Sequence, residues 1–221
     1  MREKIKKILD KPSGILKKKE FEEMTMEEEL KALRKENTKL KKSLQEQGIE
    51  KFKNRRSIRK FSNKKIDFKK IHSIIEAGLN APCAGNIQNT KVIVVENYDK
   101  RLECGKVALQ QYWIADAPII LVVVRDDTEV VDLYPEYGKT YSVQNSAALI
   151  ENMLMAVHFY DLGACWVECG DNDVLKDLFK VPVEKKIDAM IPIGYPLEKP
   201  QVEKCPTASM IYFEEWGELN K

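Results

Sequence analysis

The hydrophobic positions between residues 55 and 200 follow short periods that predict alternating helices and strands. Apolar residues recur at helical spacing in some segments, and β-branched residues cluster in others. Helices are predicted over 68–79, 141–163 and 172–181, and strands over 91–97, 118–126, 164–170 and 188–196. The strand at 118–126 is apolar nearly throughout, as in a central strand buried on both faces. The helix at 141–163 is apolar nearly all round, which predicts burial, and Gly163 is its expected end.

The first 48 residues follow a different pattern. Apolar positions alternate at spacings of four and three residues, with an Asn inside the series: Met26, Leu30, Leu33, Asn37, Leu40 and Leu44. This is a short heptad stripe with Asn37 at an a position. Thr25 with Glu28 suggests a capping box at its start, and Gly48 its end. Two interpretations stay open: an amphipathic helix lying on its own domain, or one that pairs with a partner helix.

The pattern therefore predicts two parts, a charged helical extension over residues 1–48 and a globular α+β domain over 49–221. The chain has 221 residues, of which 43% are hydrophobic and 33% charged, enough for a substantial core. Its longest apolar run, Ala117 to Val124, is too short to span a bilayer, and the N-terminus lacks the features of a secretory signal. No membrane partner is expected.

The five cysteines are odd in number and include no CxxC motif. Without a secretory signal, reduced thiols in the cytoplasm are the simplest interpretation. Two histidines and these scattered thiols do not make a zinc pattern, so no metal site is expected. The net charge of +2 does not call for nucleic acid. The basic residues of the first part are interspersed with acids and lack aromatic neighbours, so no nucleic-acid partner is expected.

One short segment is strongly basic. The stretch "KNRRSIRKFSNKK", residues 53–65, contains seven Lys and Arg among 13 residues, with Ser57 between Arg56 and Arg59. Guanidinium groups bind phosphate with two hydrogen bonds at once, so several of them beside a hydroxyl suit a phosphate group. A solubilising basic run is the alternative on charge alone.

A second segment has the small side chains of a ligand-binding loop. The stretch "NAPCAGNIQN" combines Pro82 and Gly85 with Asn86 and Gln88. Such loops let a flat ligand approach the main chain, and amide side chains can bind the edge of a heteroaromatic ring.

Five motifs in order give the chain a wider resemblance: "RRSIRKF", "APCAGNIQ", "ADAPIILVVV", "NMLMAVHFYDLGACWV" and "IPIGYP". Together they resemble the FMN-dependent nitroreductase family, from Ile49 to Trp216. The resemblance implies a central, mostly antiparallel sheet flanked by helices, in an intertwined homodimer with FMN at the interface. The long apolar helix would belong to the dimer core, and the C-terminal segment would wrap around the partner.

The resemblance also implies the FMN-binding residues. Arg55, Arg56, Ser57 and Arg59 match the segment that holds the phosphate and ribityl chain, and Pro82, Cys83, Ala84 and Asn86 match the loop that reaches FMN from the other subunit. Gln110 would lie near the pyrimidine edge, and Lys204 near the phosphate. The strand end beside the flavin ring would be Val167, Glu168, Cys169 and Gly170.

Some positions depart from the family pattern. Cys83 replaces a Ser, Glu168 stands where many relatives have Gly, and Lys204 replaces an Arg. Lys keeps the charge of Arg but loses its bidentate hydrogen bonding. A carboxylate beside the flavin would lower its reduction potential, whereas a Glu168 that points away would have no effect.

The function that the resemblance implies is an FMN oxidoreductase. It would pass hydride or electrons from NADH or NADPH through the flavin to a nitroaromatic, a quinone or a similar small acceptor, in ping-pong turnover. No side chain is assigned as catalytic, because the chemistry belongs to the flavin. The alternative is a flavin-binding interaction or sensor protein whose N-terminal helix docks a partner. That helix would contact either the twin subunit or another protein.

Overall fold

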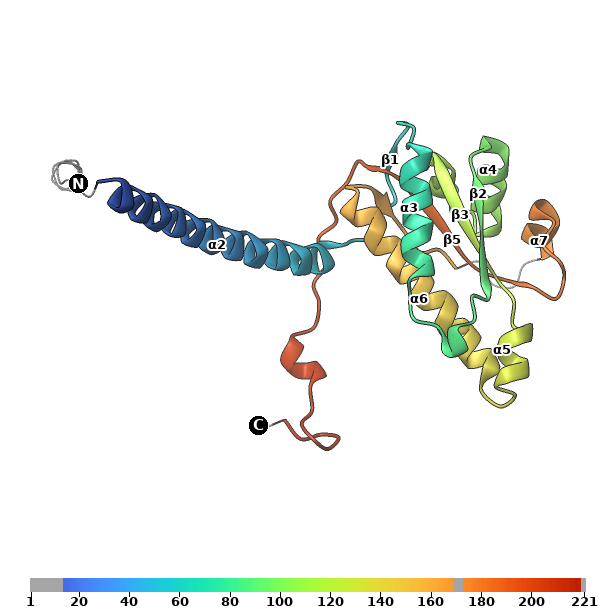
Figure 1. The fold of residues 1–221 in the computed structure, drawn as a ribbon. Coiled ribbons are helices and arrows are strands. Elements are labelled where there is room, and N and C mark those ends of the chain that lie inside the picture. Colours follow the sequence, from blue (N-terminus) through green and yellow to red (C-terminus); the bar gives the residue numbers. More distant parts are fainter. Residues whose placement is uncertain (1–13, 169–172, 220–221) are drawn as a thin grey trace. The chain divides into compact units, whose positions relative to one another are not determined.

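The computed structural model describes residues 14–168 and 173–219, and the chain divides into two units after Lys53. Figure 1 shows the described part of the first unit as one continuous helix, α2 (Gly14–Asn54). Both expected ends of this helix are wrong. Thr25 lies inside it, and the helix continues through Gly48 for six more residues. A glycine costs only about 1 kcal/mol within a helix, and the Glu and Lys that follow favour helix continuation.

The second unit is built on a sheet of five strands (Figure 1). Their order is β1-β5-β3-β2, with β4 also paired to β5, and all the strand pairs are antiparallel. This confirms the expected antiparallel sheet. The strands are β1 (Phe61–Ser62), β2 (Thr90–Val95), β3 (Ile119–Arg125), β4 (Gly163–Ala164) and β5 (Lys186–Pro196). The edge of β5 that faces away from β3 carries both β1 and β4, so it brings together segments about 100 residues apart.

Strand β3 is buried along its whole length, as the sequence predicts for a central strand. Its side chains alternate between two hydrophobic clusters because successive residues of a strand point to opposite faces. Ile119, Leu121 and Val123 enter one cluster, and Ile120, Val122 and Val124 enter the other. The sheet is therefore the middle layer of the domain.

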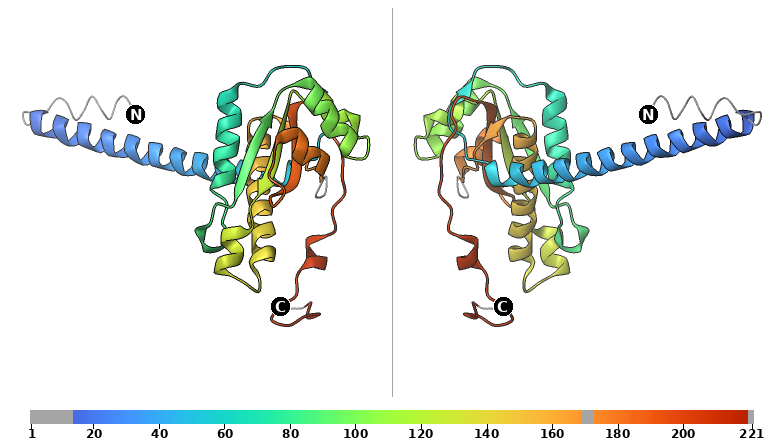
Figure 2. Two further views of the ribbon diagram at one scale, coloured as in Figure 1. Left: turned by 90° about the vertical axis from the view of Figure 1, so that its right-hand side faces the viewer. Right: turned by 90° about the vertical axis from the view of Figure 1, so that its left-hand side faces the viewer.

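Helices cover both faces of this sheet. On one face lie α3 (Phe68–Leu79) and α6 (Gly138–Phe159), which the views of Figure 2 show side by side. On the other lie α4 (Tyr98–Val107) and α7 (Asp173–Phe179). The helices expected at 68–79 and 172–181 are confirmed by α3 and α7. The sequence pattern does not predict helix α4, because half of its ten residues are charged and only Cys104 and Gly105 are buried.

Helix α6 differs from its prediction at both ends. It begins at Gly138, and it ends at Phe159 rather than at Gly163. Asp161 adopts a left-handed conformation (φ 55°), and the Leu162 N–H donates to the Val157 carbonyl at 3.0 Å. This is a Schellman ending with Asp in the place usually taken by Gly. The helix is also not buried all round in a single chain, since its outer side exposes Thr140, Val143, Gln144 and Glu151.

The strand expected at 164–170 is mostly absent from the described residues. Regular pairing stops at Ala164, and a single bridge joins Val167 to Met190. The register of β4 continues to this bridge, but the ladder is interrupted between them, because the residue of β5 that would pair with Cys165 is Pro192, which has no N–H to donate. Among the described residues, no helix is both long enough and apolar enough to cross a membrane.

Candidate functional site

The basic segment after α2 is attached to the sheet by its main chain. Ser57 forms a parallel bridge with Ala164, and the Ile58 N–H donates to the Ala164 carbonyl at 2.9 Å. The Ile58 side chain is buried with Phe61 and Ala117. A Cβ at Gly163 would lie only 2.7 Å from the Ile58 side chain, so this close approach requires glycine. The backbone thus fixes the segment while its polar side chains stay at the surface.

Three predicted residues, Arg55, Ser57 and Arg59, act on one thiol, that of Cys165. Burial raises the pKa of the Cys165 thiol above its ordinary value. The charges of Arg59 and Arg55 and a hydrogen bond with Ser57 oppose that increase without cancelling it. The thiol is therefore protonated and neutral at physiological pH, and it adds no negative charge beside the cations.

Glu198 meets this segment from the end of β5. Its carboxylate accepts a hydrogen bond from the Arg59 N–H at 2.6 Å, while the Arg59 guanidinium lies 5.8 Å from the centre of the Trp113 ring. The Arg59 side chain is exposed, so its charge is available to a ligand. The Glu198 carboxylate thus binds the main chain of Arg59 rather than its guanidinium.

Arg55 and Arg56 lie half-buried against α6. The Arg55 Nε is 3.9 Å from the Glu151 carboxylate, and an Arg56 guanidinium nitrogen donates to the Arg55 carbonyl at 2.7 Å. Both arginines line a hollow of about 60 Å³ with Glu198. The rest of its wall includes Leu154, Val157, His158 and Leu162.

The strand end expected beside the flavin is only partly described. Val167 is buried and exchanges two hydrogen bonds with Met190, at 3.0 and 2.8 Å. Glu168 follows it and is exposed. Cys169 and Gly170 lie outside the described residues. Val167 and Glu168 therefore lie two and three residues beyond Cys165, in the stretch of chain that the basic segment joins at Ala164.

The second predicted group, the loop 82–86, is held at the beginning of α6. The Ala84 N–H donates to the Asn145 side-chain oxygen at 2.8 Å. Gly85 and Asn86 both adopt left-handed conformations (φ 63° and 56°) and turn the chain. A Cβ at Gly85 would lie 2.8 Å from the Leu133 side chain, so glycine is required by conformation and by space. Pro82 and Asn86 are exposed.

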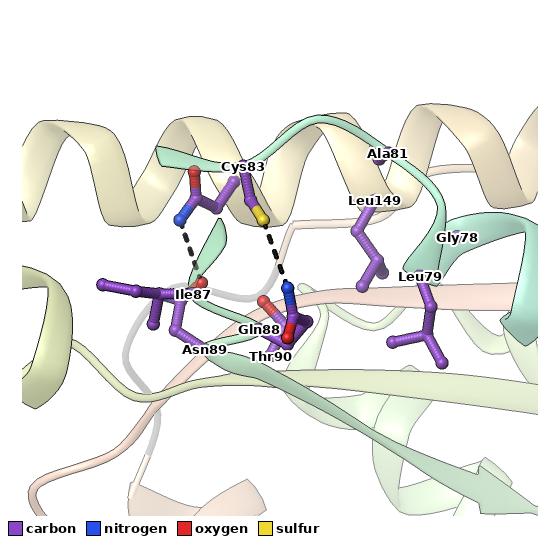
Figure 3. Close-up of a pocket in the computed structure, with 10 residues that line it drawn as sticks. Gly78, Leu79, Ala81, Cys83, Ile87, Gln88, Asn89, Thr90 and Leu149 are labelled. Carbon is purple, nitrogen blue, oxygen red and sulfur yellow. Dashed lines mark hydrogen bonds between the residues drawn. The ribbon is translucent and has the colours of Figure 1, made fainter. Parts of the chain in front are cut away.

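Figure 3 shows the small hollow beside this loop, of about 20 Å³. The Gln88 side-chain nitrogen donates to the Asn86 carbonyl at 2.6 Å and lies 3.6 Å from the Cys83 sulfur. Cys83 is half-buried and is a free thiol. The amide of Gln88 therefore serves to brace the loop against itself.

Behind the loop, a buried chain of polar side chains leads away from Asn145. The Asn145 amide donates to the Asn89 side-chain oxygen at 3.3 Å, and the Asn89 amide donates to the Ser142 hydroxyl at 2.5 Å. The Ser142 hydroxyl in turn donates to Asp127 at 2.6 Å. Buried polar groups are costly to leave unpaired. These linked hydrogen bonds therefore fix the side chain of Asn145, which binds the loop.

This series of hydrogen-bonded side chains ends at Asp127, which belongs to a group of ion pairs at the end of β3. Arg125 donates to Asp127 and, through its Nε at 2.8 Å, to Asp188. Burial disfavours its charge, but the hydrogen bonds and charges of the two aspartates outweigh that effect and raise the pKa of Arg125. The loop is thus connected to a charged group held firmly within the sheet.

Gln110 and Lys204 lie apart from these two groups. Gln110 is exposed in the turn after α4, with a left-handed conformation (φ 60°). Lys204 is exposed in the C-terminal segment just before the short 3-10 helix η3 (Thr207–Met210). Within the described ranges, no side-chain hydrogen bond or ion pair joins either residue to another predicted site residue.

The two groups that the structure does assemble lie on different turns of α6. The loop bonds to Asn145, whereas the basic segment faces Glu151 to His158, up to 13 residues or about 20 Å along the axis. Each adjoining hollow is far smaller than the roughly 300–1,000 Å³ of a ligand pocket. Larger hollows, of about 580 and 480 Å³, contain none of the residues predicted to bind FMN, although Gln88 of the loop lines the second. One chain alone does not enclose a cofactor-sized site from these groups.

Three residues of the site were missed by sequence reasoning: Asn145, Cys165 and Glu198. Asn145 carried a signal, because a buried amide on an otherwise apolar helix calls for a polar partner. Cys165 and Glu198 carried none, because their position beside the basic segment depends on which strands share the edge of β5.

Known proteins resemble this chain in sequence. A protein from Methanothermobacter thermautotrophicus that carries the name NADH dehydrogenase/NAD(P)H nitroreductase is 28% identical over 172 residues, covering 76% of this chain and 87% of its own. An NADPH-flavin oxidoreductase from Vibrio harveyi is 24% identical over 174 residues, covering 75% and 72%.

Solved structures share the fold. The NADPH:FMN oxidoreductase of Vibrio harveyi, solved with NAD⁺, superposes with a TM-score of 0.69 at 24% identity, over 78% of this chain and 79% of that one. An FMN-dependent nitroreductase from Clostridium difficile R20291 gives a TM-score of 0.65 at 22% identity, over 76% and 99%. The Nitroreductase family profile matches residues 52–112 and 103–195, and the chain belongs to the nitroreductase family.

Proposed function

We propose that this protein is an FMN-dependent oxidoreductase. It takes electrons from NADH or NADPH and passes them to a nitroaromatic, a quinone or a similar small acceptor in ping-pong turnover. The family membership supports this proposal, as do relatives named for NAD(P)H nitroreductase and NADPH-flavin oxidoreductase activity.

The observation that carries the proposal is the attachment of the basic segment to Ala164, which holds Arg55, Ser57 and Arg59 beside Cys165. Two guanidinium groups and a hydroxyl form a donor set suited to a phosphate dianion, and the neighbouring thiol is neutral. The segment is held by its main chain, and the exposed Arg59 side chain is available for a ligand. The residues present therefore fit the phosphate end of FMN.

Each group of residues has a distinct role in this proposal. The basic segment binds the phosphate, and the loop 82–86 offers a fixed backbone and small side chains to the ring. When bound, FMN supplies the redox chemistry, and the protein positions it and excludes competing reactions. The residues proposed to contact FMN are Arg55, Arg56, Ser57, Arg59, Pro82, Cys83, Ala84, Asn86, Gln110, Val167, Glu168, Cys169, Gly170 and Lys204.

A homodimer is the second part of the proposal. The two groups lie on different turns of α6, so a second chain would bring its loop to the basic segment of the first. The outer side of α6, with Val143 half exposed, would be part of that interface. The C-terminal segment exposes several large apolar side chains that a partner could cover: Met210, Ile211, Tyr212, Trp216 and Leu219.

The cytoplasmic location expected from the sequence is kept within this proposal. It is supported by the cysteines, since all four that the structure describes are free thiols. Glu168 is exposed, which is compatible with either of its expected effects on the flavin.

The deciding experiment is the absorbance spectrum of the purified protein, recorded before and after addition of NADH or NADPH under nitrogen. We expect flavin bands that bleach with at least one nucleotide and recover when a quinone or nitroaromatic is added. Flavin bands that neither nucleotide bleaches would favour the flavin-binding sensor considered from the sequence. A protein that neither contains nor takes up FMN would contradict the proposed function altogether.

A further inference from the structure

Helix α2 lies almost entirely outside the region shared with the family, because the family match begins at residue 52 and the helix ends at Asn54. Nothing in the proposed oxidoreductase chemistry uses it. Its apolar stripe is nevertheless regular, with spacings of four and three residues, and each apolar side chain is between 47% and 68% exposed. The stripe consists of Met26, Leu30, Leu33, Leu40 and Leu44, with Asn37 in the same series. A seam of this kind is the surface by which two helices supercoil.

The charges beside the seam define which helix would fit it. With Asn37 at an a position, Glu36 takes the preceding g position and Lys41 the e position five residues later. In two parallel helices in register, each g residue lies next to the e residue of the following heptad on the partner. Glu36 of one helix would then face Lys41 of the other, twice by symmetry.

The sequence repeats this arrangement one heptad earlier, where Glu29 precedes Arg34 by the same five residues. An antiparallel pair would instead bring g residues beside g residues and e residues beside e residues. Acids would then meet acids, and bases would meet bases. The charge pattern therefore favours a parallel copy of the same helix over an antiparallel one.

Asn37 gives the same answer independently. A single Asn at an a position fixes register in parallel two-stranded coils, because the two amides can pair only when the helices are aligned. In the same helix, the ion pair between Lys42 and Glu46 (4.0 Å) lies at f and c positions, away from the seam. The seam charges and the outer charges thus occupy different sides of α2.

We propose that α2 pairs with the α2 of a second copy of this chain, as a parallel, in-register, two-stranded coiled coil. The seam extends from Met26 to Gln47, about 32 Å of helix. About three heptads make a pair of modest stability, so the charges at g and e contribute a substantial share of its specificity.

Disulfide trapping in the full-length protein tests this pairing. Gln47→Cys places a thiol at the next d position of the seam, and Gln45→Cys places the same thiol at a b position on the opposite side of the helix. Both side chains are exposed, and neither belongs to the apolar stripe. The two variants are therefore a matched pair, and the unmodified protein measures cross-linking by its native cysteines.

Under mild oxidation, we expect Gln47→Cys to form a disulfide-linked dimer about tenfold faster than Gln45→Cys, because two d-position thiols of a parallel pair lie within disulfide reach. Equal rates would overturn the proposal, since cross-linking would then not depend on which side of the helix carries the thiol. No cross-linking of Gln47→Cys would also overturn it, because residue 47 meets its twin only in a parallel, aligned pair.

A charge exchange in the Gln47→Cys protein tests the partner directly. Glu36→Lys sets like charges against Lys41 and should slow cross-linking about threefold or more, whereas Glu36→Lys with Lys41→Glu should restore it. Failure of the double change to restore cross-linking would exclude this register. The readout requires no flavin, so its outcome is separate from that of the proposed function.

Discussion

The two halves of the candidate site are held in place by different parts of the chain. Main-chain hydrogen bonds and the buried Ile58 side chain hold the basic segment 55–59 against β4. The loop 82–86 is held by the side chain of Asn145 and the buried polar chain behind it. The first half should therefore keep its position when its polar side chains are changed. The second should depend on single side chains that never touch the ligand.

The largest expected effect comes from Gly163→Ala, which disturbs the main-chain attachment of the basic segment to β4. The added Cβ would lie 2.7–2.9 Å from three atoms of the buried Ile58, so the basic segment must shift. We expect a loss of about 2 kcal/mol in the free energy of unfolding and weaker flavin retention. Denaturant unfolding and the flavin content after gel filtration measure both. Gly48→Ala is the control, because nothing lies within 4 Å of its added Cβ and the helix should gain stability.

The next effect separates binding from folding in the same half. Arg55→Ala with Arg59→Ala removes two cations, while the main-chain bonds of the segment remain. We expect FMN affinity to fall about tenfold or more, because charge-assisted hydrogen bonds to phosphate are strong, with little change in stability.

Equilibrium dialysis against FMN and thermal unfolding of the apoprotein provide the two readouts. Lys60→Ala is the matched control, since it removes an exposed charge from the same run. Unchanged FMN affinity in the double variant would contradict the phosphate assignment.

A third variant tests the side-chain attachment of the loop. Asn145→Ala leaves the Ala84 N–H without its acceptor and the Asn89 side-chain oxygen without its donor, which should cost about 1–2 kcal/mol of stability. Faster hydrogen exchange in residues 82–89 and weaker FMN binding should accompany that loss.

Asn152→Ala is the control on the same helix, because the Asn152 amide donates to the Ala77 carbonyl of α3 at 3.2 Å instead. It should lose similar stability without changing exchange in the loop. Equal effects of the two variants on the loop would show that Asn145 has no special role there.

The smallest expected effect concerns Asp126, which precedes Asp127 at the end of the buried series of polar side chains. Hydrogen bonds from Lys185 and Thr128 lower the pKa of Asp126 from 3.8 to about 2. The folded protein therefore binds this proton less readily than the unfolded chain, so the contribution to stability is complete above about pH 4. It is lost as the pH falls through about 2.

Because this pair is partly exposed, we expect less than about 1 kcal/mol. Unfolding of Asp126→Asn and the original protein, followed from about pH 5 to pH 2, should give stabilities that converge at the acid end. A difference that stays constant with pH would assign the stability to something other than this charge.

Local patterns in the sequence were sufficient to predict the elements in which the spacing of apolar residues matches the spacing of buried residues. Helix α3 and strands β2, β3 and β5 lie close to their predicted positions, because apolar spacing directly reflects which faces are buried. Helix α2 shows the limit of the same rule. Its stripe predicted a helix, but the spacing of Leu and Asn did not locate its ends, which depend on weak propensities near Thr25 and Gly48.

The sequence by itself determined the order of the elements, the nitroreductase resemblance and the basic segment that supplies the candidate phosphate ligands. Only the tertiary structure decided what that segment lies against. Gly163, expected to end a helix, is instead the point where Ile58 crosses the sheet edge, and Cys165 lies beside Ser57 although 108 positions separate them. Such contacts follow from the pairing of β1 and β4 with β5, and strand pairing joins residues by register rather than by any local pattern that a sequence displays.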